Sequence, residues 1–108
     1  MAFGLDDLNT IIGNRAGASP AESYTARLLH EGVSKCAQKL GEEAVEASLA
    51  AVKGDKAELV RESADVLYHL LVLLKATDVK LADVYAELEA RQKRLGQAES
   101  GSDRAVDA

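Results

Sequence analysis

One stretch decides the fold, residues 39–76, which reads KLGEEAVEASLAAVKGDKAELVRESADVLYHLLVLLKA. On both sides of Gly54 it is dense in Ala, Leu, Glu and Lys, which are strong helix formers. Gly54 suits the left-handed residue that ends a helix, and Asp55 with Glu58 three residues later has the pattern of a capping box that begins the next one. Because the turn is so short, we expect two long helices packed as an antiparallel hairpin.

Apolar residues at helical spacing indicate three further helices around this hairpin. Ser19-Pro20-Ala21-Glu22 has a capping-box pattern with proline at the first helical position, so the second helix is expected to begin there. The expected helices cover residues 5–14, 20–30, 33–53, 56–76 and 81–95. No segment shows the period of a strand. We therefore predict an all-α domain over residues 1–95, followed by a tail, residues 96–108, that is expected to be disordered.

The second long helix needs more cover than one short chain offers. Residues 64–74 are apolar at every position except Asp65 and His69, with Tyr68 amphipathic. A helix that is apolar nearly all round must be surrounded, and a chain of 108 residues builds only a modest core. We expect a helical bundle completed by a second copy of the chain, as a homodimer or a larger homo-oligomer.

Composition excludes several partners. The formal net charge is −5 and no basic run is present, which argues against binding to nucleic acid. The longest apolar run, residues 70–74, is far too short to span a membrane, and the N-terminus lacks the features of a secretory signal. A single cysteine, Cys36, allows no internal disulfide and no thiolate zinc site, which fits a cytoplasmic protein. We interpret Cys36 as a core residue.

Acidic residues on the two long helices form the candidate site. Spacings of three and four place Glu42, Glu43 and Glu46 on one stripe. Glu62 and Asp65 lie on one stripe of the antiparallel helix, so facing helices would pool up to five carboxylates. Asp65 interrupts the most apolar segment, where an unpaired ionised carboxylate would cost several kcal/mol. Something positive is therefore expected beside Asp65.

An all-oxygen set of this kind suits a hard cation such as Mg²⁺ or Mn²⁺. Without one, the like charges would repel, so the empty site should be less stable. A di-iron bundle would need Glu-x-x-His pairs, and the sequence has none. Two other interpretations remain open: a buried basic partner for Asp65, and a solvated helix face for Glu42 and Glu43.

Three basic or titratable residues adjoin the acidic stripe. Lys35 and Lys39 lie four apart and lead into it, so they are placed to meet phosphate oxygens, although simple helical pairing with glutamate explains them equally well. His69 falls one turn beyond Asp65. A histidine in this position is either a hydrogen-bonded core residue or a catalytic acid or ligand.

Three blocks of the chain closely resemble the phosphoribosyl-ATP pyrophosphohydrolase family: SYTARLLHEG at 23–32, KLGEEAVEASLAA at 39–51 and ESADVLYHLLVLL at 62–74. The resemblance covers roughly residues 5–94. EExxE followed by ExxD also resembles the signature of the wider all-α nucleoside triphosphate pyrophosphatase superfamily. The resemblance implies Mg²⁺-dependent hydrolysis of phosphoribosyl-ATP to phosphoribosyl-AMP and pyrophosphate, the second step of histidine biosynthesis.

The same resemblance implies roles for individual residues. It implies that the acids that activate water are Glu42, Glu43 and Glu46. It implies that the metal ligands are Glu43, Glu46, Glu62 and Asp65. The expected contacts to substrate are Lys35, Lys39, His69 and Arg27. The alternatives are a superfamily enzyme that acts on dUTP, dCTP or damaged nucleotides, and a non-catalytic helical dimerisation module.

Overall fold

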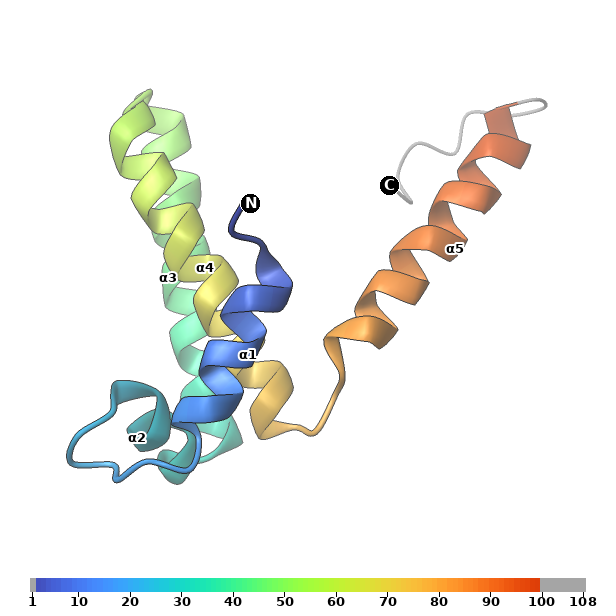
Figure 1. The fold of residues 1–108 in the computed structure, drawn as a ribbon. Helices are drawn as coiled ribbons and strands as arrows, with labels where there is room; N and C mark the ends of the chain where they lie inside the picture. Colours follow the sequence, from blue (N-terminus) through green and yellow to red (C-terminus); the bar gives the residue numbers. More distant parts are fainter. Residues whose placement is uncertain (1, 100–108) are drawn as a thin grey trace.

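The computed structural model describes residues 2–99, and within that range it contains five helices and no strand, so the all-α prediction is confirmed. The helices are α1 (Leu5–Arg15), α2 (Tyr24–Glu31), α3 (Val33–Lys53), α4 (Lys56–Ala76) and α5 (Leu81–Glu99). Figure 1 shows α3 and α4 as a long hairpin, with α1 beside α4 and α2 at the base. This arrangement places the acidic stripes of α3 and α4 next to each other.

The turn of the hairpin has the predicted geometry. Gly54 adopts a left-handed conformation with φ 76°, and its N–H donates to the carbonyl oxygen of Ala51 at 3.1 Å. The Asp55 carboxylate accepts a hydrogen bond from the N–H of Glu58 at 3.0 Å, which satisfies one of the open donors at the start of α4. The predicted bounds of both long helices are confirmed.

The predicted start of the second helix is wrong. Ser19 does accept a hydrogen bond from the N–H of Ala21, but the chain makes only a turn over residues 20–22. Ser23 is then extended, with φ −130° and ψ 123°, and its hydroxyl accepts from the N–H of Ala26 at 3.1 Å. Ser23 therefore caps α2, which begins at Tyr24, because a helix cannot run through an extended residue.

A small apolar core joins the base of the hairpin to the other helices. Its buried members are Ile12, Leu28, Cys36, Leu71, Val72 and Leu81. Cys36 is fully buried and its thiol donates to the carbonyl oxygen of Leu28 at 3.4 Å, which confirms its interpretation as a core residue. The core thereby packs the lower half of the hairpin against the other helices, and the carboxylates lie further along the hairpin toward its turn.

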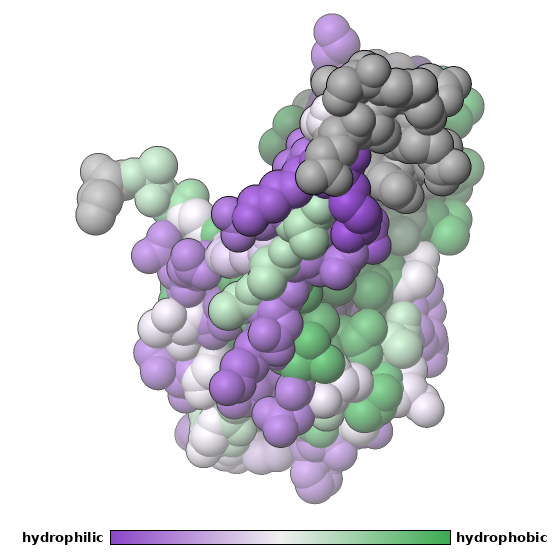
Figure 2. All heavy atoms as spheres, turned by 90° about the vertical axis from the view of Figure 1, so that its right-hand side faces the viewer, coloured by the Kyte–Doolittle hydropathy of each residue, from purple (hydrophilic) through white to green (hydrophobic). Residues whose placement is uncertain are grey.

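The last helix is longer than predicted and leads away from the others (Figure 1). It continues past residue 95 to Glu99, and the rest of the predicted tail, residues 100–108, lies outside the described residues. Leu81 at its start is buried, whereas Tyr85 and Leu88 are 38% and 44% exposed. Figure 2 shows hydrophobic surface on the face of the molecule beside this helix. Within residues 2–99, no helix is long and apolar enough to cross a membrane.

The hairpin also leaves an apolar stripe uncovered. Its members on α3 are Val45, Leu49 and Val52, and on α4 they are Val60 and Leu67; all are exposed. On α4 the contrast is sharp, since Leu71 is 1% exposed and Leu67, one turn earlier, is 41% exposed. The sequence predicted that α4 needs cover on every side, and the described residues of one chain cover only part of it.

Candidate active site

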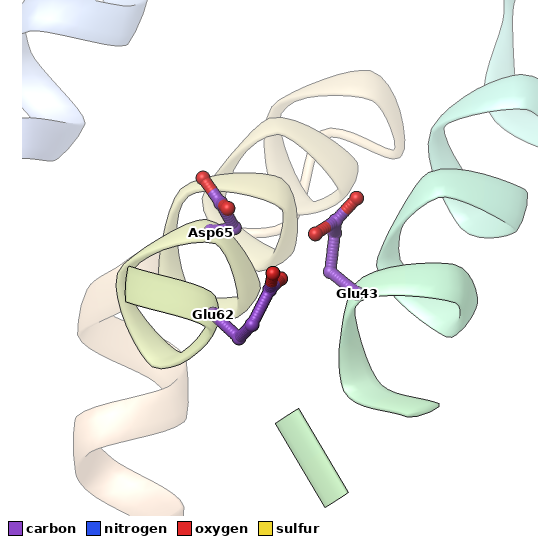
Figure 3. Close-up of side chains that lie close together, drawn as sticks. All are labelled: Glu43, Glu62 and Asp65. Carbon is purple, nitrogen blue, oxygen red and sulfur yellow. The ribbon is translucent and has the colours of Figure 1, made fainter. Parts of the chain in front are cut away.

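Three carboxylates converge between the two long helices. Glu43 extends from α3 toward α4, Glu62 extends from α4 toward Glu43, and Asp65 lies beside Glu62 on α4 (Figure 3). One oxygen of each lies within 4.8 Å of the others, a spacing at which a single ion can contact all three. The hairpin produces this arrangement because Glu62 and Asp65 are three residues apart and share a helix face.

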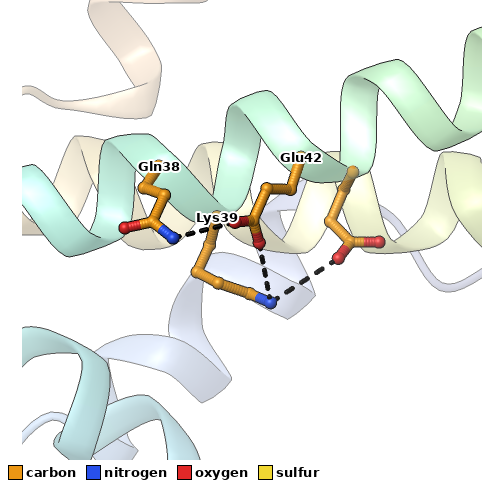
Figure 4. A network of polar contacts seen from close by, with 4 residues as sticks. Gln38, Lys39 and Glu42 are labelled. Carbon is orange, nitrogen blue, oxygen red and sulfur yellow. Dashed lines mark hydrogen bonds and ion pairs between the residues drawn. The ribbon is translucent and has the colours of Figure 1, made fainter.

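The other two predicted carboxylates lie outside this group of three. Glu42 is exposed and turned toward its own helix: it accepts a hydrogen bond from Gln38 at 2.8 Å and pairs with Lys39 at 3.3 Å (Figure 4). These contacts hold the pKa of Glu42 below its ordinary value. Glu46 is also exposed, and makes no hydrogen bond or ion pair with any residue in the range 2–99. Its charge nevertheless reaches Glu62.

The negative charges of the site act on the pKa of Glu62. The neighbouring Glu43, shielding from water and the charges of Glu46 and Asp65 raise the pKa of Glu62 to about 7. Its Oε1 atom is buried and has no hydrogen-bond partner among the described residues. A buried oxygen without a partner is costly, and a cation beside it would remove both that cost and the repulsion. The donor set therefore fits a hard divalent cation.

The prediction that Asp65 is shielded from water is wrong. The Asp65 side chain is exposed, because its position on α4 faces the solvent side of the hairpin rather than the apolar core. It makes no ion pair with any lysine or arginine in the described part of the chain, so the interpretation that a buried basic residue neutralises it finds no support. Glu43 and Glu62 are both partly buried, and the buried oxygen without a hydrogen-bond partner within residues 2–99 is Oε1 of Glu62.

Lys39 is the cation nearest to the carboxylates. Its Nζ atom lies 3.3 Å from Glu42 and 3.8 Å from Glu43, and these partners raise the pKa of Lys39. The predicted pairing with helical glutamates is thus present, and the same position puts the ammonium group at the edge of the site. Lys35 is half-buried and pairs with no carboxylate within residues 2–99, although its charge helps to lower the pKa of Glu42.

His69 is buried against two tyrosines. Its side chain is 5% exposed, and its ring meets Tyr24 and Tyr68 edge-on at centroid distances of 6.1 and 5.0 Å. Burial lowers the pKa of His69, and the charges of Glu43 and Asp65 only partly oppose this, so the imidazole is neutral at pH 7. Its Nδ1 atom has no hydrogen-bond partner among the described residues, unlike the hydrogen-bonded core histidine that the sequence suggested.

Sequence reasoning missed the aromatic wall beside the carboxylates. Tyr24 and Tyr68 stack at 6.3 Å, and the Tyr68 hydroxyl shares a hydrogen bond with Thr25. Arg27, a predicted substrate contact, lies over the ring of Tyr24 at 5.3 Å and donates a hydrogen bond to the carbonyl oxygen of Pro20. It makes no hydrogen bond or ion pair with the three converging carboxylates. No local pattern reveals this wall, because it joins α2 and α4.

The metal-free protein is expected to lose stability as the pH rises from about 4.5 to about 7. In that window folded Glu62 keeps a proton that the unfolded chain has released, so the folded state binds more protons and the free energy of unfolding falls with pH. Above about 7 both states are ionised and this effect is constant. Thermal unfolding in EDTA across this range would show it, and Glu62→Gln should flatten the slope. An unchanged slope in that variant would contradict the assignment.

The fold and the site define a class: all-helical enzymes that gather carboxylates between two antiparallel helices, an arrangement suited to a hard cation and a phosphate substrate. A family model described as phosphoribosyl-ATP pyrophosphohydrolase matches residues 5–92. The chain therefore belongs to the phosphoribosyl-ATP pyrophosphohydrolase family, and the resemblance seen in the sequence is confirmed.

Relatives of nearly equal length support the same family. Proteins named phosphoribosyl-ATP pyrophosphatase from Methylobacterium radiotolerans, Agrobacterium fabrum and Roseobacter denitrificans are 57%, 54% and 60% identical to this chain. The matches cover 95%, 94% and 88% of this chain and 96%, 94% and 90% of those proteins. The family likeness thus spans the helices that carry the site.

Proposed function

We propose that this chain hydrolyses phosphoribosyl-ATP to phosphoribosyl-AMP and pyrophosphate, the second step of histidine biosynthesis. Membership of the family and the names of its relatives support the substrate. The products require water to cleave the anhydride between the α- and β-phosphates, with the proton of water passing to a base. The observation that supports a site for this chemistry in the chain is the convergence of Glu43, Glu62 and Asp65.

We propose that Mg²⁺, or Mn²⁺ in its place, binds to these three carboxylates and to Glu46. A bound divalent cation neutralises phosphate charge and lowers the pKa of the attacking water. The buried, unpartnered Oε1 atom of Glu62 and the crowding of like charges around it support the position of the cation. Glu46 has a free carboxylate and its charge reaches Glu62, so it can serve as a further ligand or as the proton acceptor.

The remaining residues position the substrate in this proposal. Lys39 lies beside Glu43 and can exchange its glutamate partners for phosphate oxygens, with Lys35 one turn earlier on α3 extending the cationic edge. His69 remains a proposed substrate contact, but its unpartnered Nδ1 atom is buried, so a hydrogen bond from that atom to the substrate requires a shift of the neighbouring side chains. Glu42 is held by Gln38 and Lys39, so its predicted part in activating water depends on substrate drawing Lys39 away.

We further propose that the protein works as a homodimer or larger homo-oligomer in the cytoplasm. The exposed apolar stripe of the hairpin supports association, because contiguous apolar surface of this kind marks interfaces. Cys36 is a buried free thiol, as suits a reducing compartment.

Pyrophosphate release from phosphoribosyl-ATP, ATP and dUTP, measured with Mg²⁺ and with EDTA, tests the proposed function. The expected result is release from phosphoribosyl-ATP alone, abolished by EDTA and restored by excess Mg²⁺. Preferred turnover of dUTP would keep the site but move the protein to the nucleotide-clearing enzymes of the superfamily. If the folded protein hydrolyses none of the three substrates and its melting temperature does not change with Mg²⁺, the interpretation as a non-catalytic dimerisation module is favoured.

A further inference from the structure

The proposed substrate carries a group that ATP lacks. Phosphoribosyl-ATP has a second ribose phosphate, attached to the base and therefore remote from the triphosphate. An enzyme that prefers it to ATP has to contact that ribose phosphate, since the triphosphates of the two molecules offer the same interactions, and the phosphate is its most strongly interacting part. The contact should come from a cationic side chain outside the carboxylate group, next to a pocket that can hold a sugar.

One pocket meets this description. It has a volume of about 600 Å³ and lies where the end of α1, the start of α2 and the middle of α4 come together. Its lining is Arg15, Glu22, Ser23, Tyr24, Thr25 and Tyr68. The other large pocket, of about 610 Å³, lies among α1, the end of α4 and α5 and is also lined by cations, Lys75 and Lys80. It lies further from the carboxylates along α4, because its first lining residue there, Leu74, comes well after Tyr68 in the helix.

The position of the first pocket relative to the carboxylates suits one extended ligand. Tyr68 follows Asp65 by three residues, so the pocket begins about 4.5 Å further along the axis of α4 on the same face. The rings of Tyr24 and Tyr68 both contact His69, whose pKa responds to the charges of Glu43 and Asp65. His69 thus links the aromatic wall of the pocket to the part of the hairpin that carries the carboxylates.

Arg15 supplies the charge that a remote phosphate requires. Its guanidinium makes no ion pair with any residue in the range 2–99, so its donors remain available. Arg15 also lies close enough to influence the Tyr68 hydroxyl, since its charge opposes the rise that burial causes in the pKa of Tyr68. A guanidinium binds a phosphate with two parallel hydrogen bonds. Glu22 lines the same pocket and opposes this attraction, but its exposed side chain is free to turn away.

Hydroxyl groups complete the lining for a sugar phosphate. Thr25 and Tyr68 share one hydrogen bond, which uses only one of their two hydroxyl hydrogens and leaves the other to donate. The Ser23 hydroxyl accepts from the N–H of Ala26, so its own hydrogen is also available. The pocket therefore offers a cation and hydroxyl donors together, which is what the oxygens of a ribose phosphate need.

We propose that the pocket of Arg15, Tyr24 and Tyr68 binds the second ribose phosphate of the substrate, and that Arg15 is the residue that distinguishes phosphoribosyl-ATP from ATP. This inference rests on the proposed function, because it names the part of the site that recognises the distinctive end of that substrate. Arg15 acts in binding, and the carboxylates act on the triphosphate.

Arg15→Gln tests this by calorimetric titration of the full chain, with Mg²⁺ present, using AMP and phosphoribosyl-AMP as the two probes. The native protein should bind phosphoribosyl-AMP more tightly than AMP. In the variant the dissociation constant for phosphoribosyl-AMP should rise by about ten- to a hundredfold, as expected for lost hydrogen bonds to a charged group, while that for AMP changes less than about twofold. Arg15→Lys should recover part of the loss, and Arg91→Gln, on α5, is the matched control.

The outcomes separate the inference from the proposed function. Equal binding of the two probes by the native protein, or an equal loss for both in Arg15→Gln, would overturn the role of Arg15. A native protein that releases no pyrophosphate from phosphoribosyl-ATP would contradict the proposed function, and the binding data would still decide whether this pocket recognises the ribose phosphate. Circular dichroism of each variant, expected to match the native spectrum, excludes loss of the fold as the cause.

Discussion

Glu62→Gln is expected to lower kcat/KM for phosphoribosyl-ATP by about a thousandfold while raising the melting temperature of the metal-free protein at pH 8. Glutamine keeps the size of the side chain but replaces the anionic carboxylate with a neutral amide. The buried Oε1 atom of that carboxylate has no other partner among the described residues and is the proposed contact to the cation. It also removes the charge of Glu62 itself, which its surroundings disfavour strongly enough to raise the pKa of this residue to about 7, so the empty site becomes less repulsive. Activity and stability therefore move in opposite directions.

Two comparisons give this prediction its force. In the native protein Mg²⁺ should raise the melting temperature, because it binds the folded state; in Glu62→Gln that increase should shrink or vanish. Glu89→Gln, on the exposed surface of α5, is the matched control and should leave both quantities unchanged. A variant that loses activity and stability together would mean that Glu62 supports the fold, and full activity would remove it from the proposed metal site.

The hairpin was predictable because its signals are local. Gly54 and Asp55 meet the conformational needs of a helix end and a helix start, and no distant contact is required to read them. The start of α2 was not predictable by the same rule, since two serines four residues apart both accept a hydrogen bond from a following backbone N–H. A helix continues only after Ser23, whereas Ser19 is followed by a turn, and the proline after Ser19 led to the wrong prediction.

The acidic residues were predictable as a set, but their grouping was not. Spacings of three and four place side chains on one face, yet they leave open how far the hairpin is rotated. The structure rotates Glu43 inward and leaves Glu42 to Lys39. Asp65 looked buried because its sequence neighbours are apolar, whereas burial on a helix depends on the face and not on the neighbours in sequence.

The pocket beside the carboxylates lay beyond any reading of the sequence. Arg15, Tyr24 and Tyr68 come from three helices, and neither a motif nor a spacing connects them. The apolar stripe of the hairpin was anticipated only as a need for cover. The structure shows where the stripe lies, because Leu71 is buried in the core and Leu67, one turn earlier on α4, is exposed.

Leu71→Ala is expected to destabilise the protein by about 2–5 kcal/mol, which is a large part of the total stability of a small domain. Leu71 is 1% exposed in the core, so the substitution leaves a cavity that its neighbours cannot fill. Leu67→Ala, one turn away on α4, is the matched comparison. In a single chain its 41% exposed side chain would contribute far less to the free energy of unfolding.

Denaturation at two protein concentrations turns this pair into a test of association. If the apolar stripe is covered by a second copy of the chain, the midpoint for the native protein rises with concentration, because dimerisation stabilises the folded state by mass action. Leu67→Ala should then reduce that rise, while Leu71→Ala should lower the midpoint at both concentrations. A native midpoint independent of concentration, with a mild effect of Leu67→Ala throughout, would mean that the stripe of α3 and α4 is not an interface between copies. The difference between the two leucines thus separates the stability of one chain from the stability gained by pairing.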